Sequence, residues 1–177
     1  MFCVSGLFSS ATQVKFLCPD LDSGTRLSVT VETRSTATKA LTFTMQETSP
    51  TILSLDGSDG GQGLVSFLET PEVVMNRNSR IPARPAQPGD RILIWTTGLG
   101  SAAETATGTL AVKLGGIYAE IESVHAVPGQ AGLYAIQVNI PRATPFGDSV
   151  PVQVLVATKN GGQAGSNIVT ISVEAAR

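Results

Sequence analysis

The stretch that decides the fold is Leu27-Ser28-Val29-Thr30-Val31, in which apolar and hydroxyl-bearing side chains alternate strictly. Leu41-Thr42-Phe43-Thr44-Met45 shows the same alternation after a polar connection over residues 32–39. Successive side chains of a β-strand point to opposite faces, so a period of two indicates a strand with one apolar and one wet face. The two runs therefore predict a β-hairpin.

The rest of the 177-residue chain carries short runs of the same kind, about ten residues apart and separated by Gly and Pro. They lie at residues 13–17, 63–67, 110–114, 118–124, 134–140, 150–156 and 168–173, and a more continuous apolar run lies at 92–95. Many short strands with such punctuation are typical of β-sandwiches. Residues 71–88 differ, because their prolines interrupt any alternation, and we expect a long surface loop or extended segment there.

The end of the chain repeats the predicted hairpin. Val150-Pro151-Val152-Gln153-Val154 corresponds to the first alternating run, and Gly147 corresponds to Gly24. Val169-Thr170-Ile171-Ser172-Val173 corresponds to the second run. An internal repeat of this kind indicates two units built on one pattern.

The repeat extends upstream, where Gly132-Leu133-Tyr134 and Gln137-Val138-Asn139-Ile140 correspond to Gly6-Leu7-Phe8 and Gln13-Val14-Lys15-Phe16. Only five residues precede Gly6, whereas about four strands precede the second copy, from residue 63 to residue 124. We therefore predict that the first unit is incomplete.

The predicted fold class is all-β, with immunoglobulin-like β-sandwich units in tandem. Residues 1–48 would be the C-terminal half of one unit, and 49–88 a linker with one short strand and a Pro-rich loop. Residues 89–177 would form the second sandwich, which the strand at 63–67 could join. A half sandwich leaves an apolar sheet face and open strand edges. We expect it to pack on the second unit, on another copy of the chain, or on a strand donated by a protein partner.

Charge and hydropathy exclude several classes of protein. The net charge is −2, and no stretch concentrates Lys and Arg. Nucleic-acid-binding proteins normally present a basic face with aromatics, so no nucleic-acid partner is expected. No apolar run reaches the roughly 18 residues that span a bilayer, so no membrane insertion is expected. The start of the chain lacks the basic and apolar regions of a signal peptide.

The chain resembles a known family. Pro88-Gly89-Asp90, Ile92-Leu93-Ile94-Trp95 and Thr97-Gly98-Leu99-Gly100 resemble the opening of IPT/TIG-type immunoglobulin-like domains. Val112-Lys113-Leu114-Gly115-Gly116-Ile117-Tyr118-Ala119 looks like a later step of the same units. With the repeated segments after residue 127, nearly the whole chain resembles the uncharacterised C-terminal domain of large secreted acidobacterial (Solibacter-type) proteins.

This resemblance implies tandem IPT/TIG-like units and a module that begins before the first residue of this chain. It also implies export, and a secreted or cell-surface setting as part of a longer protein. It implies no activity, cofactor or catalytic residue. The chain departs from the family pattern at Thr96, where Gly is usual, and at Cys18.

Candidates for chemistry are few. His125 is the only histidine, and no Gly-x-Ser-x-Gly motif is present, so we expect no enzyme, no catalytic residue and no cofactor. Asp56-Gly57-Ser58-Asp59-Gly60-Gly61 places two carboxylates, Asp56 and Asp59, in a tight turn, as calcium loops do. The same residues dominate plain turns, so a turn without a metal is the favoured interpretation and calcium the weaker one.

Two further candidates stay open. A disulfide between Cys3 and Cys18 would close a short loop, and the alternative is two small buried hydrophobes. Trp95, Tyr118 and Tyr134 could offer flat faces on which a sugar ring stacks, whereas packing inside the protein is the favoured role for Trp95.

The leading hypothesis from the sequence is a non-enzymatic module of a secreted or surface protein, acting as a spacer, stalk or adhesion unit. A carbohydrate-binding accessory module, with polysaccharide as its partner, is the alternative.

Overall fold

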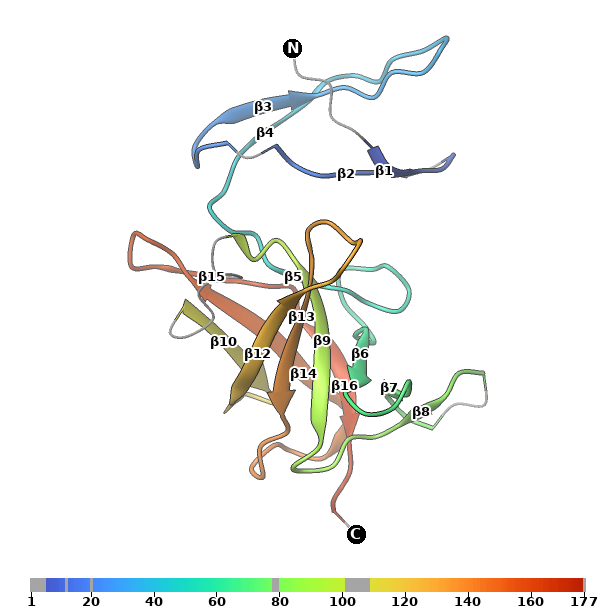
Figure 1. The fold of residues 1–177 in the computed structure, drawn as a ribbon, viewed down its shortest axis with the longest axis vertical. Coiled ribbons are helices and arrows are strands. Elements are labelled where there is room, and N and C mark those ends of the chain that lie inside the picture. The colour runs from blue at the N-terminus through green and yellow to red at the C-terminus, as the bar shows by residue number, and fades with distance from the viewer. Residues whose placement is uncertain (1–5, 12, 20, 78–79, 101–108, 177) are drawn as a thin grey trace. The chain divides into compact units, whose positions relative to one another are not determined.

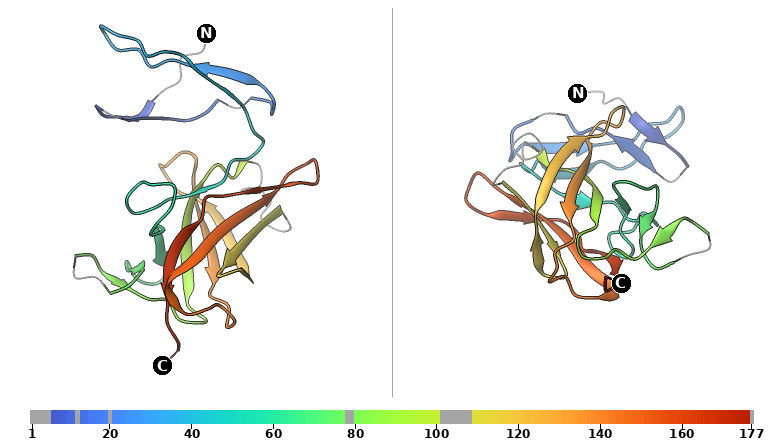
Figure 2. Two further views of the ribbon diagram at one scale, coloured as in Figure 1. Left: turned by 180° about the vertical axis from the view of Figure 1, so that it is seen from behind. Right: turned by 60° about the horizontal axis from the view of Figure 1, so that its bottom comes forward.

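The computed structural model describes the chain except for residues 1–5, 12, 20, 78–79, 101–108 and 177. The chain divides into two compact units, unit 1 (Met1–Glu47) and unit 2 (Thr48–Arg177). The named elements are β-strands, and those of unit 2 form two sheets that pack face to face (Figures 1 and 2). The predicted all-β, sandwich-like fold is therefore confirmed.

One layer of unit 2, the β9 sheet, is named after its central strand. Its strand order is β12-β13-β9-β6-β7-β8, and β5 also pairs with β9. Its neighbouring strands are antiparallel, except for the parallel pair β7 and β8. The strands are β5 (Thr51–Ile52), β6 (Val65–Phe67), β7 (Val73–Val74), β8 (Ala83–Arg84), β9 (Arg91–Thr97), β12 (Ile121–Ala126) and β13 (Leu133–Asn139).

The other layer is the β14 sheet. Its order is β11-β10-β14-β15, and β16 pairs with the first half of β14. All of these pairs are antiparallel. The strands are β10 (Leu110–Leu114), β11 (Ile117–Ala119), β14 (Gly147–Ala157), β15 (Gln163–Gly165) and β16 (Val169–Val173).

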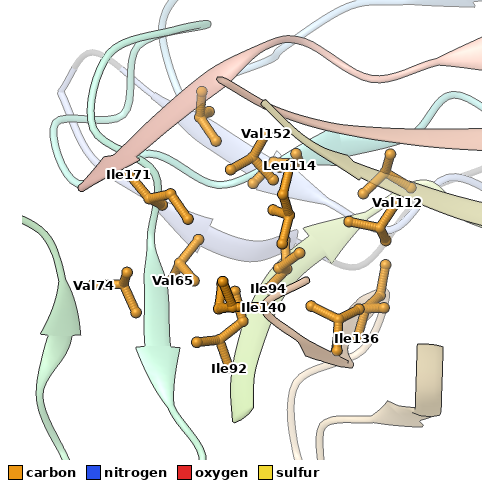
Figure 3. Close-up of a cluster of buried hydrophobic side chains, with 14 of the residues drawn as sticks. Val65, Val74, Ile92, Ile94, Val112, Leu114, Ile136, Ile140, Val152 and Ile171 are labelled. Atoms are coloured by element: carbon orange, nitrogen blue, oxygen red, sulfur yellow. The ribbon is translucent and has the colours of Figure 1, made fainter. Parts of the chain in front are cut away.

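The core lies between the two sheets. Burial alternates along β9, where Ile92, Ile94 and Thr96 are fully buried, and Leu93 and Trp95 between them are not. From the opposite layer Val112, Val152 and Ile171 point toward Ile92 and Ile94 (Figure 3). Each buried aliphatic side chain of this size contributes roughly 1.5–3 kcal/mol relative to exposure. Burial alternates along β9 because one side of the strand faces the other sheet and the opposite side is partly exposed.

The chain crosses from one layer to the other at Glu120. Ala119, in β11, pairs with Val112 of the β14 sheet, whereas Ile121, in β12, pairs with Val138 of the β9 sheet. The sequence predicts one continuous strand over residues 118–124, and this prediction is wrong. Alternation runs on through the exposed Glu120 and gives no local sign that the chain changes sheets.

Residues 49–88, predicted to be a linker, are part of unit 2. Strands β5 and β6 pair with β9, and Ile52, Val65 and Phe67 are buried in the core. The segment 71–88 is not a free surface loop either, because it carries β7 and β8 and buries Val74 and Ala86. These apolar side chains fill the end of the sandwich beside β16, which is why the segment cannot stay separate.

The described residues of unit 1 form two hairpins. Strand β1 (Gly6–Ser9) pairs with β2 (Val14–Phe16), and β3 (Arg26–Val29) pairs with β4 (Leu41–Thr44), both antiparallel. The correspondence of residues 6–8 with 132–134 does not extend to the structure. In unit 2 residue 133 begins the same strand as Gln137, whereas in unit 1 the chain reverses between β1 and β2.

We predict that Ile94→Ala lowers the free energy of unfolding of unit 2 by about 2–5 kcal/mol, because it leaves a cavity between the sheets. Ile168→Ala is the matched control, since Ile168 is 53% exposed. Urea unfolding followed by the fluorescence of Trp95, the only tryptophan, measures unit 2 alone. Equal losses in the two variants would contradict a core at Ile94.

Thr96 gives a second prediction, of opposite sign. It is fully buried, and its Oγ1 atom has no hydrogen-bond partner among the described groups. An unsatisfied buried hydroxyl costs stability, so Thr96→Val should raise the free energy of unfolding by about 1 kcal/mol. Thr97→Val, on the more exposed side of the strand, should change it little. A loss of stability in Thr96→Val would show that the hydroxyl has a partner.

Candidate functional site

The hairpin of β3 and β4 presents an apolar face that is exposed along β4 and half-buried along β3. Leu27 lies opposite Phe43, and Val29 lies opposite Leu41, so these four side chains share one side of the sheet. We call them the apolar face. Leu41 is 69% exposed and Phe43 38% exposed. Among residues 9–47, none whose burial is described is fully buried. The face is therefore available for contact.

In unit 2, β14 and β16 pair in the same register as β3 and β4. Val150 lies opposite Ile171, and Val152 lies opposite Val169, position for position with the pairs of β3 and β4. There, however, all four side chains are buried against the β9 sheet. The two hairpins thus share one pattern of pairing but differ in whether a second sheet covers it.

A side-chain hydrogen bond accompanies both hairpins. In unit 1 the backbone N–H of Val31 donates to Thr38 Oγ1 at 3.0 Å, and the N–H of Thr38 donates back to the Val31 carbonyl at 2.9 Å. In unit 2 the N–H of Val154 donates to Ser166 Oγ at 2.9 Å, and the N–H of Ser166 donates to the Val154 carbonyl at 2.8 Å. The likeness therefore extends past the strands themselves.

The outer edge of β16 is occupied in unit 2. The N–H of Thr170 donates to the carbonyl of Gly61 at 2.7 Å, and the N–H of Gly63 donates to the Thr170 carbonyl at 2.9 Å. Further along, the N–H of Ala86 donates to the Ser172 carbonyl at 2.9 Å. The backbone groups that β16 turns away from β14 are therefore satisfied by earlier segments of the chain.

The corresponding edge of β4 is open. Met45 exchanges hydrogen bonds with the β3 side, where its N–H donates to Thr25 and its carbonyl accepts from Gly24. Alternate residues of an antiparallel strand direct their backbone groups to the same neighbour. The N–H and C=O groups of Thr42 and Thr44 therefore point away from β3. In the described part of the chain β4 has β3 as its single strand neighbour.

The three aromatic candidates lie on different surfaces. Trp95 is partly exposed, and its Nε1 donates to Ser66 Oγ at 3.1 Å. Tyr134, on the neighbouring strand, packs against the core. Tyr118 is 61% exposed on β11 of the other sheet, with the Lys113 ammonium 4.8 Å from its ring centre. They do not form one platform, and polysaccharide binding stays a prediction.

The loop that carries the calcium candidates is held by its own hydrogen bonds. Asp56 Oδ1 accepts from the N–H of Ser58 at 3.0 Å and from Ser58 Oγ at 2.7 Å. Those bonds from Ser58 lower the pKa of the Asp56 carboxyl, with a further contribution from Ser54. Asp59 is exposed in the same loop. Within the described residues no cluster of three or more His, Cys, Asp or Glu is placed to hold a metal.

The other predicted residues remain apart. Cys18 is an exposed free thiol, and Cys3 lies outside the described residues, so the disulfide stays a prediction. His125 is exposed on β12, where it pairs with Ala135 of β13. Neither position brings a nucleophile and a base together.

A charged cluster around Arg84 has no counterpart in the sequence analysis. Its guanidinium lies 2.8 Å from Asp90 and 3.3 Å from Glu72, and stands 3.6 Å above the ring of Phe67. Its partners come from separate strands and loops, so no spacing in the sequence signals it. Because the guanidinium is held by two carboxylates, the cluster joins β8 to the start of β9 rather than leaving a cation free for a ligand.

Comparison with protein-family models, curated proteins and solved structures finds no match for this chain. Among the residues that the structure describes, no helix has the length and apolar character needed to cross a membrane.

We predict that Ser58→Ala raises the pKa of Asp56 toward its ordinary value of 3.8, because the largest stabilising hydrogen bond is lost. Since the folded-state pKa is lowered, the ionised carboxylate stabilises the loop above pH 3.8, and this contribution is lost as the pH falls through the lowered pKa. Carbon-13 NMR titration of the carboxyl group measures the change. The control is Ser149→Ala, outside the loop, and an unchanged pKa in Ser58→Ala would contradict the assignment.

Proposed function

We propose that this chain is a non-enzymatic spacer and interaction module of a secreted or cell-surface bacterial protein, built from IPT/TIG-like immunoglobulin units in tandem. The resemblance of residues 88–100 and 112–119 supports the family, and the shared register of the two hairpins supports the tandem arrangement. The observation that carries the spacer role is the path of the chain through unit 2.

The chain enters unit 2 at one end of the sandwich and leaves at the other. On entry, Thr51 of β5 pairs with Thr97, the last residue of β9. On exit, Val173 of β16 forms a bridge with Ala86, which precedes the first residue of β9. Strand β9 has seven residues, so the two ends lie roughly 20 Å apart. A unit crossed from end to end adds its length to the protein.

The entry point is fixed by Gly98. The N–H of Ser49 donates to the Gly98 carbonyl at 2.9 Å, and Thr48 Oγ1 donates to the same oxygen at 2.9 Å. Gly98 has a φ of 72°, and a Cβ atom there would lie 2.0 Å from the Ser49 carbonyl oxygen. Any other residue would push the entering segment off the end of β9, so this glycine is required by the close approach.

The terminal strands are arranged to bear tension. Strand β5 runs antiparallel to β9, and so does β6. Gln62, just before β6, forms a parallel bridge with Thr170 of β16. The entering and leaving strands therefore run in the same direction and are pulled from opposite ends. Tension loads their hydrogen bonds in shear, so several bonds must break together rather than one after another.

Unit 1 supplies the interacting part of the module. Its apolar face and the open edge of β4 offer both a hydrophobic surface and unpaired backbone groups. A strand added to such an edge gains main-chain hydrogen bonds and covers apolar side chains at the same time. We therefore propose that a protein partner or a second copy of the chain binds there.

The spacer role predicts that the unfolding force of unit 2 depends on the direction of pulling. Pulled through Thr48 and residue 177, the unit should resist several times more force than when it is pulled through Phe146 and residue 177. Gly147 and Val173 are paired at one end of β14 and β16, so the second geometry unzips this pair of strands bond by bond. Single-molecule force spectroscopy measures both on the same fold. Equal forces in the two geometries, or a weaker end-to-end direction, would contradict a load-bearing spacer.

A further inference from the structure

We infer that β4 pairs antiparallel with β4 of a second copy of this chain, with Phe43 on the two-fold axis. This inference rests on the proposed function in one respect, the role of unit 1 as the interacting part. It adds the identity of the partner and the register of the contact.

The composition of β4 suits it to pairing. Exposed edge strands are normally protected by charged residues, by proline or by a bulge. Residues 40–46, Ala-Leu-Thr-Phe-Thr-Met-Gln, contain no charge, no proline and no glycine. Thr and Phe are among the residues that favour strands. The other edge of the hairpin differs, because β3 carries the exposed Arg26 within the strand. The open edge of β4 is thus the one without protection.

In unit 2 the edge that corresponds to the open edge of β4 is hydrogen-bonded to other segments of the chain. The outer edge of β16, which has the same register against its neighbour, carries the hydrogen bonds to Gly61, Gly63 and Ala86 described above. In unit 1 the groups that correspond to them belong to Thr42 and Thr44. A strand from a second molecule would satisfy these groups in the way that earlier segments of the chain satisfy those of β16.

The charges that flank β4 favour an antiparallel pairing with a second copy. Lys39 and Glu47 lie four residues before and four residues after Phe43, each outside β4. An antiparallel pairing centred on Phe43 brings the end of the strand next to Lys39 toward the end next to Glu47 of the partner subunit, twice in one interface. In the same register Thr42 faces Thr44 of the partner subunit with both backbone groups available for exchange. Opposite charges placed across a strand pair favour the pairing, and like charges oppose it.

The pairing also extends the apolar face. Leu41 and Phe43 lie on the same side of β4, because they are two residues apart in the strand. Two hairpins joined at β4 form one four-stranded sheet in which the apolar faces of both copies are continuous. Three or more strands with one apolar face are needed for independent stability, so the four-stranded sheet meets a condition that an isolated two-stranded hairpin does not.

The test uses the full chain and measures its mass by light scattering over a dilution series. The wild type should form a dimer that dissociates on dilution. Lys39→Glu and Glu47→Lys each place like charges opposite each other twice, so each should dimerise about tenfold more weakly. Mixed in equal amounts, the two variants restore opposite charges at both positions, and a heterodimer should form with the wild-type affinity. Arg34→Glu, in the hairpin connection, is the charge-matched control and should dimerise like the wild type.

A second variant tests the edge itself. Thr44→Pro removes an outward N–H without removing a bond to β3, so it should abolish the dimer while the far-ultraviolet circular dichroism of the chain is kept. A wild type that stays monomeric at all concentrations would overturn the inference. So would a mixture of the two charge variants that does not associate, or a Thr44→Pro chain that still dimerises. The force measurement on unit 2 is independent of all these results, so failure of the dimer and failure of the spacer role are distinguishable.

Discussion

Apolar side chains from β9 and β14 pack against each other between the two sheets of unit 2, and the remaining parts of the unit are arranged around that contact. Ile92 and Ile94 need a cover on the inner side of the β9 sheet, and Val152 and Val154 supply it from the β14 sheet. Residues 49–88 belong to the same unit because their apolar side chains cover the part of this core that β9 and β14 leave open. The exposed Glu120 marks the place where the chain leaves one layer for the other.

Much of this could be predicted from the sequence, where a strand is long and its pattern is clear. The alternation over Leu27–Val31 and over residues 134–140 identifies strands correctly because one side of each strand is more buried than the other. The pattern fails for β7 and β8, which have two residues each and too little length to show a period. It fails again at residues 118–124, because the change of sheet depends on partners far away in the chain.

Some features of the candidate surface on unit 1 could likewise be predicted from the sequence, and others could not. That unit 1 would carry an apolar face could be expected from the strict alternation of its second hairpin. The identity of the open edge could not, because it depends on which side of β4 meets β3 and on a comparison with β16. Composition alone could not predict where the aromatic side chains lie. Trp95 and Tyr134 are on neighbouring strands but point to opposite faces of one sheet. The Arg84 cluster arises only when β8 and the start of β9 are brought together.

The bridge between β16 and the segment before β6 has a consequence for how the protein is made. Thr170 donates a hydrogen bond to the carbonyl of Gly61, which lies 109 residues earlier in the chain. This bond can therefore form only after the intervening residues have been synthesised. The strand pairings described in unit 1 are local and can form as soon as they emerge, whereas long-range pairing is slow. During translation the hairpin of β3 and β4, with its open edge, therefore exists at the same time as apolar strands of unit 2 that have not yet paired. While residues 60–170 are being synthesised, apolar strands lack their final partners. Mispairing is most favoured in this interval, and a chaperone that binds exposed apolar strands would be most useful then.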